Sequence, residues 1–399
     1  MTSPAILGPL NNLHEMQAQL LESLPQADAA RQFHPDLGSL NWLFGAGVYQ
    51  ELYWLREVLT GDTDLSQRVE RLFRLDALPL HEQCAQLPPK DHLLNWGREI
   101  QEEHLLRLAN PGILPNHQLL ANERLQWFLL QEQAKRYETM LLLLNLRSLQ
   151  RGDHSYQVES PLIPAPPRWE TKELSQGHYR IGARNQPEAY DNELPPQAVE
   201  LSSYRIALQP VSNSQFLTFM QSGGYRNMEL WSEAGGDWRQ SAQQRHPMYW
   251  RQDHSGNWYS VGINGPSDLP PDEPVTGISQ YEAQAFATWA GSLGDEYAGA
   301  VLQHEYQWEL AARSGVIKQI GRAWEWCSNI FHPYPEFQPF PDETTSMTDF
   351  RQRQISLRGG SIHTQKLLRR ASMRHRAPAA QGFQLSGLRL VFPARHRWS

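Results

Sequence analysis

The chain has 399 residues, of which 40% are hydrophobic and 20% charged, and its formal net charge is −7. This length suits two or three domains with cores of their own, and this composition excludes a disordered chain or a coiled coil. The longest apolar run, near residues 140–144, is far shorter than the roughly 18 residues that cross a bilayer. The N-terminus lacks the basic and apolar regions of a signal peptide, so we expect a cytoplasmic protein without a membrane segment.

Cysteine content and charge distribution exclude further classes. The two cysteines, Cys84 and Cys327, are too few for a disulfide framework or a four-cysteine zinc site. From residue 351 to the C-terminus there are ten arginines, one lysine and no acidic residue. We expect these arginines to pair with carboxylates elsewhere in the fold, because no aromatic-interleaved motif of a nucleic-acid-binding protein accompanies them. Nucleic acid is therefore not an expected partner.

In the first part of the chain, apolar residues recur at helical spacing over residues 10–150. One such face begins at Leu13, and a second occupies residues 42–55. A third amphipathic stretch runs over residues 118–149, and prolines separate the later helices from one another. We predict about four helices, which form a bundle over residues 1–155.

A change of composition marks the domain boundary. Residues 160–167 read Ser-Pro-Leu-Ile-Pro-Ala-Pro-Pro, which favours an extended linker, and we assign residues 156–198 to it. Residues 199–399 are rich in Gly, Pro, Trp and Tyr, with short apolar runs between turn signals and helix-like stretches at 214–221 and 280–290. We therefore predict an α+β protein of two domains, with the helical bundle first.

Ordered motifs in the second domain carry a family resemblance. They are Arg205-Ile-Ala-Leu-Gln-Pro-Val-Ser-Asn213, Gly223-Gly224-Tyr225, Pro274-Val-Thr276, Trp289-Ala-Gly291, Trp324-Glu-Trp326, Leu357-Arg-Gly-Gly-Ser361 and Gly387-Leu-Arg-Leu390. In this order they resemble the formylglycine-generating-enzyme-like domain, also called the sulfatase-modifying-factor domain, which has a C-type-lectin-like fold. The run Pro-Tyr-Pro-Glu-Phe at 333–337 looks like one subgroup, the EgtB-type iron-dependent sulfoxide synthases of ergothioneine biosynthesis.

This resemblance covers nearly the whole chain, because EgtB-type proteins carry a DinB-like four-helix bundle ahead of the lectin-like domain. It implies a DinB-like bundle at 1–155, a Pro-rich linker at 156–198 and a formylglycine-generating-enzyme-like domain at 199–399. Members of the subgroup use dioxygen to join a thiol, cysteine or γ-glutamylcysteine, to the imidazole of a trimethylated histidine. In those relatives iron(II) lies between the two domains.

The iron ligands that the resemblance implies are missing from this sequence. In the family, three imidazoles hold ferrous iron and leave positions open for thiolate and dioxygen. One of the three comes from an early helix in a Trp-His-x-x-His context, and the other two come from a later helix in a His-x-x-x-His-x-Glu pattern. The matching positions here are Leu43 and Ala46, then Glu132 and Arg136, and only Glu138 is retained. No two of the 15 histidines lie within seven positions of each other, so we expect neither iron nor another cofactor.

These replacements allow two interpretations. Glu132 and Arg136 are four residues apart with the acid first, the favoured order for a helical ion pair, and Leu43 fills the remaining space. Alternatively, Glu132, Glu138 and His34 hold a cation against the repulsion of Arg136. Iron(II) is the expected cofactor only if the chain is an active enzyme with an unusual ligand set.

The second domain offers five candidate ligand-binding residues, although the sequence identifies no catalytic residue. The rings of Trp324, Trp326 and Tyr334 attract a trimethylammonium group, and Arg374 and Arg376 suit a carboxylate. In the competing interpretation the two tryptophans pack the domain core. Formylglycine generation is not expected, because the related enzymes use a copper-binding cysteine pair and this domain has one cysteine.

Three hypotheses of function are open. In the first, the chain is a degenerate EgtB-like protein, a pseudoenzyme that lacks the iron site and binds or regulates an active paralogue or binds a small-molecule ligand. In the second, it is an active iron-dependent oxidoreductase that joins a thiol to a trimethylated histidine through an unusual ligand set. In the third, it is a lectin-like module for a nucleotide or sugar. Metal content separates the first hypothesis from the second.

Overall fold

The computed structural model describes residues 2–110, 112–152, 155–184, 186–351 and 353–395, with the backbone alone at 347–349 and 351. The chain divides into two compact units, Met1–Arg151 and Gly152–Ser399, which we call the helical unit and the mixed unit. No helix of the described residues combines the length and the apolar character needed to cross a membrane. Helix and sheet together make this an α+β protein of two units.

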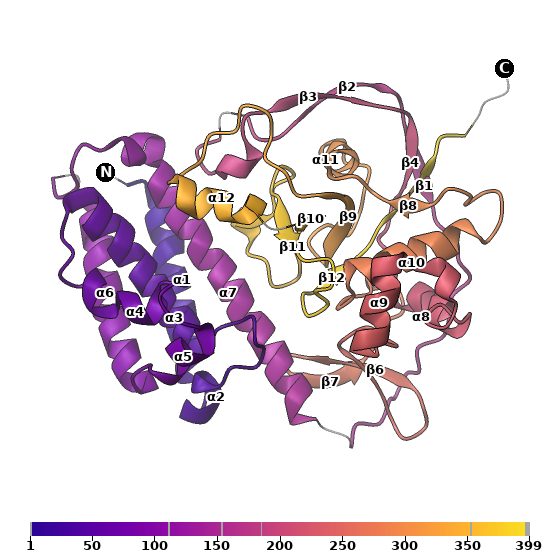
Figure 1. Ribbon diagram of the computed structural model, residues 1–399, viewed down its shortest axis with the longest axis horizontal. Helices are drawn as coiled ribbons and strands as arrows, with labels where there is room; N and C mark the ends of the chain where they lie inside the picture. The colour runs from indigo at the N-terminus through magenta and orange to yellow at the C-terminus, as the bar shows by residue number, and fades with distance from the viewer. Residues whose placement is uncertain (1, 111, 153–154, 185, 352, 396–399) are drawn as a thin grey trace. The chain divides into compact units, whose positions relative to one another are not determined.

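The helical unit is built from helices joined by short connections. They are α1 (Pro4–Glu22), α2 (Gln26–Ala30), α3 (Leu40–Leu52), η1 (Tyr53–Val58), α4 (Ser66–Phe73), α5 (Leu80–Ala85), α6 (Lys90–Ala109), η2 (Gln118–Glu123) and α7 (Arg124–Arg151). The four long helices α1, α3, α6 and α7 pack against one another (Figure 1). The helices predicted between residues 10 and 150 are thus confirmed.

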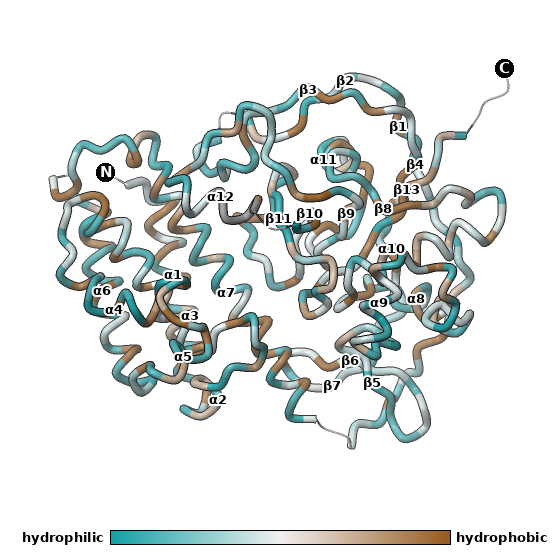
Figure 2. The backbone as a smooth tube through the Cα atoms, viewed as in Figure 1, coloured by the Kyte–Doolittle hydropathy of each residue, from teal (hydrophilic) through white to brown (hydrophobic). Residues whose placement is uncertain are grey.

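Local sequence sets several of these helix boundaries. Pro4 begins α1 at a position where a backbone N–H has no partner within the helix. The hydroxyl of Ser39 accepts a hydrogen bond from the backbone N–H of Trp42 and so caps α3. Helix α3 continues directly into η1, a π-helical turn of a kind that often accompanies functional sites. Along α1 and α7, hydrophobic and hydrophilic segments recur from turn to turn, as in helices with one buried face (Figure 2).

Four sheets are present in the part of the mixed unit that the structure describes. The first has the order β1 (Thr171–Leu174), β4 (Tyr204–Ala207), β13 (Leu390–Pro393) and β8 (Val301–Leu302). The second has the order β11 (His375–Ala377), β10 (Ile355–Arg358), β9 (Trp324–Ile330) and β12 (Ser386–Gly387). A hairpin pairs β2 (Gly177–Ile181) with β3 (Gln197–Leu201), and β5 (Trp250–Gln252), β6 (Trp258–Gly262) and β7 (Gly265–Asp268) form a meander. Of these pairs, β9 with β12 is parallel and the others are antiparallel.

The helices of the mixed unit lie between these strands in the sequence. They are α8 (Asn213–Gln221), α9 (Glu233–Ala242), α10 (Gln280–Gly291), α11 (Glu305–Arg313) and α12 (Glu343–Arg351), with short 3-10 turns η3 (Asp191–Glu193), η4 (Met228–Leu230) and η5 (Lys366–Leu368). Helices α8 and α10 are the two helix-like stretches predicted from the sequence. Each begins with a capping box on a serine, Ser212 for α8 and Ser279 for α10.

The range predicted as a linker, 156–198, contributes strands to the mixed unit. Strand β1 pairs with β4, and β2 pairs with β3 in an antiparallel hairpin. The Pro-rich residues 160–167 themselves lie outside any strand. Composition therefore located the Pro-rich segment, but the residues that follow it belong to the fold of the mixed unit.

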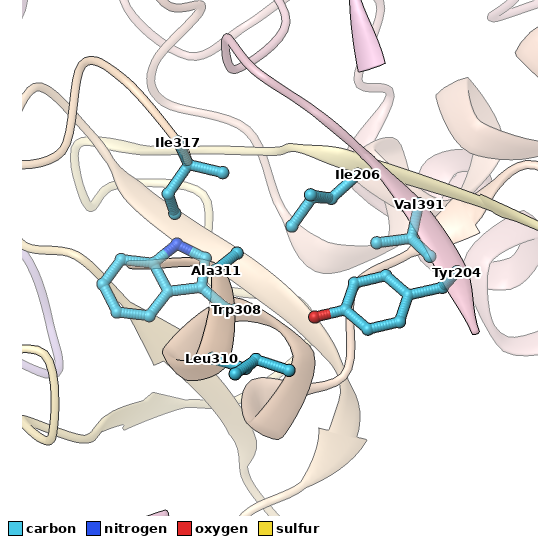
Figure 3. Close-up of a cluster of buried hydrophobic side chains, with 7 residues drawn as sticks. All are labelled: Tyr204, Ile206, Trp308, Leu310, Ala311, Ile317 and Val391. Carbon is cyan, nitrogen blue, oxygen red and sulfur yellow. The ribbon is translucent and has the colours of Figure 1, made fainter. Parts of the chain in front are cut away.

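One hydrophobic core of the mixed unit joins the first sheet to α11. The buried residues that meet there are Tyr204, Ile206, Trp308, Leu310, Ala311, Ile317 and Val391 (Figure 3). The hydroxyl of Tyr204 donates to the backbone oxygen of Gln307 at 2.8 Å, so its polar end is satisfied inside the core. This contact holds α11 against β4.

Candidate functional site

The positions that matched iron ligands lie on α3 and α7 of the helical unit. Leu43 and Ala46, on α3, are buried apolar side chains without a donor atom for a metal. On α7, an Oε atom of Glu132 is paired with Nζ of Lys135 at 2.7 Å, and Nη2 of Arg136 donates to Oε1 of Gln50 at 3.0 Å. The spacing predicted a pair between Glu132 and Arg136. Glu132 pairs with Lys135 on the same helix and its charge also acts on Arg136, whose side chain donates to Gln50 on α3.

Arg136 lies close against the backbone of α3 because residue 47 is glycine. A Cβ atom at Gly47 would stand 2.8 Å from Oε1 of Gln133 and 3.0 Å from both Cδ and Nε of Arg136, so these side chains would have to shift. Burial lowers the pKa of Arg136, while the carboxylates of Glu132 and Glu51 act to raise it. The guanidinium stays charged at neutral pH and interacts with both acids.

These residues do not fit an iron(II) ion. The early positions offer only the hydrocarbon side chains of Leu43 and Ala46, and the later pair offers a lysine-bound carboxylate and a guanidinium that has donors only. The described residues include no group of three or more His, Cys, Asp or Glu side chains arranged to hold a metal. In the loop before α3, Nδ1 of His34 accepts from the backbone N–H of Asp36 at 3.2 Å, which is a turn-capping contact. The structure therefore does not assemble the predicted alternative ligand set around His34.

Sequence reasoning missed a polar cluster in the interior of the helical unit. It consists of His14 on α1, Glu51 on α3, His104 on α6 and Gln133 on α7, one residue from each long helix, and we call it the polar core. The carboxylate of Glu51 contacts Nε2 of His14 at 2.6 Å and Nδ1 of His104 at 3.1 Å. It also accepts from Nε2 of Gln133 at 2.7 Å. All four residues are at most 4% exposed.

The polar core is organised around a charged Glu51. Burial alone would raise the pKa of this carboxyl, but the attraction of His14 and the hydrogen bonds from both histidines hold it well below its ordinary range. The far ring nitrogens, Nδ1 of His14 and Nε2 of His104, have no hydrogen-bond partner among the described residues. Because a carboxylate only accepts hydrogen bonds, Nε2 of His14 and Nδ1 of His104 are the donors in these two contacts.

A local signal in the sequence points to the polar core. On α1, Leu10, His14, Gln17 and Leu21 share one helix face and all are buried. Two polar residues within an apolar stripe require partners inside the protein. Gln17 finds one, because its Nε2 donates to Oε1 of Gln133 at 3.0 Å.

In the mixed unit, the five candidate ligand-binding residues are engaged in interior contacts. Trp326 is fully buried and its indole N–H donates to the backbone oxygen of Ile278 at 2.9 Å. Trp324, also on β9, packs its ring against His375 with the centroids 4.6 Å apart. These contacts agree with the competing interpretation that the two tryptophans pack the core.

The other three candidates lie close to one another. The guanidinium carbon of Arg374 stands 4.2 Å from the ring centroid of Tyr334. Arg374 and Arg376 both lie over the ring of Phe331. Nε and Nη2 of Arg374 donate to both oxygens of Glu305 at 2.9 Å, and its remaining donors reach the backbone oxygens of Asn192 and His332. A carboxylate ligand would therefore have to displace Glu305.

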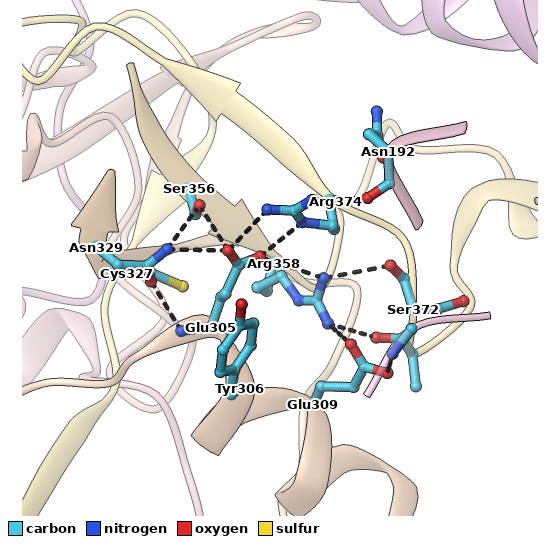
Figure 4. Close-up of polar contacts among 12 residues, drawn as sticks. Asn192, Glu305, Tyr306, Glu309, Cys327, Asn329, Ser356, Arg358, Ser372 and Arg374 are labelled. Atoms are coloured by element: carbon cyan, nitrogen blue, oxygen red, sulfur yellow. Dashed lines mark hydrogen bonds and ion pairs between the residues drawn. The ribbon is translucent and has the colours of Figure 1, made fainter. Parts of the chain in front are cut away.

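Glu305 is the centre of a buried network of charges (Figure 4). It also accepts from Asn329 and Ser356, while Arg358 pairs with Glu309. Burial would raise the pKa of Glu305, but the arginines, Arg374 first, lower it to about 2. Burial raises the pKa of the nearby Cys327 thiol. Because the thiolate is the nucleophilic form, this cysteine is unsuited to act as a nucleophile.

Several of the arginines near the C-terminus pair with carboxylates, as predicted. Besides the pairs of Arg374 and Arg358, Arg389 binds both oxygens of Glu325 at 2.8 Å and Arg370 pairs with Glu193. Three of these four arginines are almost fully buried, so their charges serve the interior of the fold.

Known proteins are similar to this chain in both the helical unit and the mixed unit. The family described as "Sulfatase-modifying factor enzyme 1-like domain" matches residues 167–319. The chain is 27% identical to "Hercynine oxygenase" of Mycolicibacterium smegmatis, over 93% of this chain and 95% of that protein. It is 29% identical to "Hercynine oxygenase" of Mycobacterium tuberculosis over 49% of this chain, a match that spans about half (54%) of that protein. With the protein of that name from Mycolicibacterium thermoresistibile it shares 28% identity, over 64% of this chain and 66% of the relative.

Proposed function

We propose that this chain, which belongs to the EgtB-type family with a formylglycine-generating-enzyme-like C-terminal domain, is a degenerate member that acts as a binding or regulatory partner. The observation that carries the proposal is Arg136. Its guanidinium stands at a position where the family has a metal-binding imidazole, and it bonds to Gln50 on the facing helix. A fixed positive charge at a ligand position opposes the binding of a metal cation.

The chemistry of the replacements supports loss of oxygenase activity. A ferrous site of this kind needs neutral donor atoms that leave open positions for dioxygen and substrate. Ala46 has no donor atom, and the carboxylate of Glu132 is already paired with Lys135. The histidines of the polar core point their N–H groups to Glu51, so they act as hydrogen-bond donors.

We further propose that the helical unit is a DinB-like four-helix bundle and that the mixed unit has a C-type-lectin-like fold, in a protein of the cytoplasm. The packing of the four long helices supports the first assignment. Because Arg374, Trp326 and Tyr334 make interior contacts, we favour a protein partner, an active paralogue, over a small-molecule ligand bound at these residues.

The test combines metal content with turnover. The purified chain is incubated anaerobically with ferrous iron, desalted and analysed for iron, and then assayed with hercynine, a thiol and dioxygen. We expect no stoichiometric iron and no coupled product. The matched comparison is the variant with Ala46→His, Glu132→His and Arg136→His together, which should gain iron if ligand loss alone separates this chain from its relatives.

One result would contradict the proposal. Near-stoichiometric iron in the native chain, lost on Glu138→Ala and accompanied by product, would replace the proposal with an active enzyme that uses an unusual ligand set. The regulatory role is tested by titrating the native chain into an active paralogue. We expect a heteromer by light scattering and a change in the kcat of the paralogue, and neither would appear for an unrelated binding module.

A further inference from the structure

We propose that this chain associates head to tail with a second copy of itself. In the proposed contact, residues 161–166 of one copy, which we call the proline ridge, dock on three aromatic side chains of the other. These are Trp231, Trp238 and Tyr281, which we call the aromatic ladder. Both surfaces belong to the mixed unit. The proposal therefore stands whether or not the chain binds iron.

The proline ridge has the features of a preformed peptide ligand. Its prolines fix their own φ angles and keep the residues before them extended, which favours the polyproline II backbone. Leu162 is buried and Ala165 is half-buried, three residues apart, which is one turn of polyproline II. The remaining ridge residues are exposed, and Ile163 is 72% exposed. The ridge therefore presents prolines and an isoleucine to the outside.

The ridge is held in place at two points. Just before it, the backbone N–H of Ser160 donates to Oδ2 of Asp268 at 2.7 Å. Within it, the backbone N–H of Ala165 donates to the oxygen of Ser214 at 3.2 Å, and Oγ1 of Thr218 donates to the oxygen of Ala165 at 2.6 Å. A segment that is already fixed loses little conformational entropy on binding. No other backbone group of the ridge is hydrogen-bonded within the described part of the chain, so its exposed carbonyl oxygens are available to donors from outside.

The aromatic ladder offers rings and donors that match such a ligand. The ring centroids of Trp231 and Trp238 are 6.4 Å apart, and those of Trp238 and Tyr281 are 5.7 Å apart. Trp238 on α9 and Tyr281 on α10 are half-buried. The indole N–H of Trp238 and the hydroxyl of Tyr281 have no partner among the described residues, and neither is a buried polar atom. Proline-rich segments dock on aromatic-lined grooves, and these two donors suit their carbonyl oxygens.

The charges beside the two surfaces are complementary. Arg168 follows the ridge and is exposed, and Glu233 and Asp237 are exposed on α9 beside the ladder. None of these three side chains forms an ion pair within the described residues. An acid–base contact at the rim would fix the direction in which the ridge lies on the ladder. In its own chain the ridge is bound to α8 and β7, so the ladder is open to the ridge of a second copy.

Sedimentation velocity of the full chain tests the contact. We expect reversible association as the concentration rises from about 10 μM to about 500 μM, the range of weak complexes. Ile163→Asp should weaken association by about 10-fold or more, because it places a charge where an apolar side chain is buried in the contact. The control is Leu75→Asp in the helical unit, because Leu75 is also 72% exposed. That variant should associate like the native chain.

A mixture of two defective variants makes the test specific for these surfaces. Trp238→Ala removes the middle ring of the ladder and should abolish association, with circular dichroism as the check that it folds. If it does not fold, Asp237→Lys, a change at an exposed residue, takes its place. An equimolar mixture of Ile163→Asp and Trp238→Ala should form dimers and nothing larger. The reason is that one variant supplies the only intact ridge and the other the only intact ladder.

A labelled peptide of residues 159–168 identifies the occupant of the ladder. By fluorescence anisotropy it should bind the native chain and Ile163→Asp, and fail to bind Trp238→Ala. The proposal is overturned if the native chain stays monomeric over the whole concentration range, or if Ile163→Asp associates like Leu75→Asp. Binding of the peptide by a chain that stays monomeric would assign the ladder to a proline-rich segment of another protein in place of a second copy.

Discussion

Replacing Glu51 by glutamine tests the polar core of the helical unit. The carboxylate contacts His14, His104 and Gln133 at 2.6, 3.1 and 2.7 Å, and all of them lie in the interior. A glutamine amide has the same shape, but one of its two ends donates. At least one of the three donors therefore loses its acceptor and faces another donor.

The expected change in the free energy of unfolding follows from these contacts. A hydrogen bond to a charged group contributes about 1.5–3 kcal/mol, and a buried donor without a partner costs about 1–3 kcal/mol. The glutamine no longer carries the cost of a buried charge, which offsets part of this loss. We expect Glu51→Gln to lower the free energy of unfolding of the helical unit by about 3 kcal/mol.

Hydrogen–deuterium exchange in the full chain measures this loss within the helical unit. Peptides from α1, α3, α6 and α7 should exchange about 100-fold faster, since each 1.4 kcal/mol is about tenfold, while peptides of the mixed unit provide an internal reference. The control is Glu103→Gln, whose side chain is 40% exposed and pairs with Arg107 on the surface. That change should cost less than about 1 kcal/mol. Equal effects of the two substitutions would refute the reasoning.

The same substitution predicts a change in pH dependence. The pKa of Glu51 lies below its ordinary value of 4.5 in the folded chain. The unfolded chain therefore binds a proton before the folded chain does, and the contribution of Glu51 to stability is lost as pH falls below about 4.5. Glu51→Gln should remove this part of the acid sensitivity of the helical unit. A variant that loses protection in acid as steeply as the native chain would show that Glu51 is not the group responsible.

Three predictions concern the mixed unit. Burial raises the pKa of Glu282 to about 7, so the native state holds a proton that the unfolded chain releases above pH 4.5. Stability should fall by on the order of 3 kcal/mol as pH rises from 4.5 to 7, and thermal unfolding of Glu282→Gln at pH 5 and pH 8 should lack this difference. Arg374→Met should cost about 3–5 kcal/mol in denaturant unfolding, because it strands a buried carboxylate, while Arg322→Met, which breaks an exposed bidentate pair, should cost less than about 1 kcal/mol. Cys84 and Cys327 are both free and buried, so a thiol reagent should label neither until the chain unfolds, and rapid labelling of either would contradict the packing described.

Elements that depend on local sequence were predicted well. The stretches 214–221 and 280–290 agree with α8 and α10 to within one residue at each end, because a capping serine and an apolar face are both local signals. Strands β1 and β2 lie within a range predicted as a linker. Their sequence is polar and follows a Pro-rich segment, and the partner of β1 is a strand more than 30 residues further along the chain. No local sequence pattern predicts that β1 pairs with β4.

Side-chain partners were harder to predict than helices. The spacing of Glu132 and Arg136 correctly placed an acid and a base on one face of α7, yet Glu132 pairs with Lys135. Spacing along one helix cannot show that the glycine at position 47 on α3 leaves room for Arg136. Tertiary packing therefore decided that the guanidinium of Arg136 also meets Gln50 on α3.

The polar core shows why the spacing of histidines along the sequence does not predict which histidines meet in the folded chain. His14 and His104 are 90 positions apart, yet both meet Glu51 because α1, α3 and α6 pack together. An imidazole that donates to a carboxylate is part of a hydrogen-bond network, and one that offers its lone pair to an ion is a ligand, so the partner decides the role. In the helical unit the carboxylate is the partner of both rings, and a guanidinium supplies the nearby positive charge. The partners of the two imidazoles in the polar core are therefore side chains of the helical unit itself, brought together by the packing of its long helices.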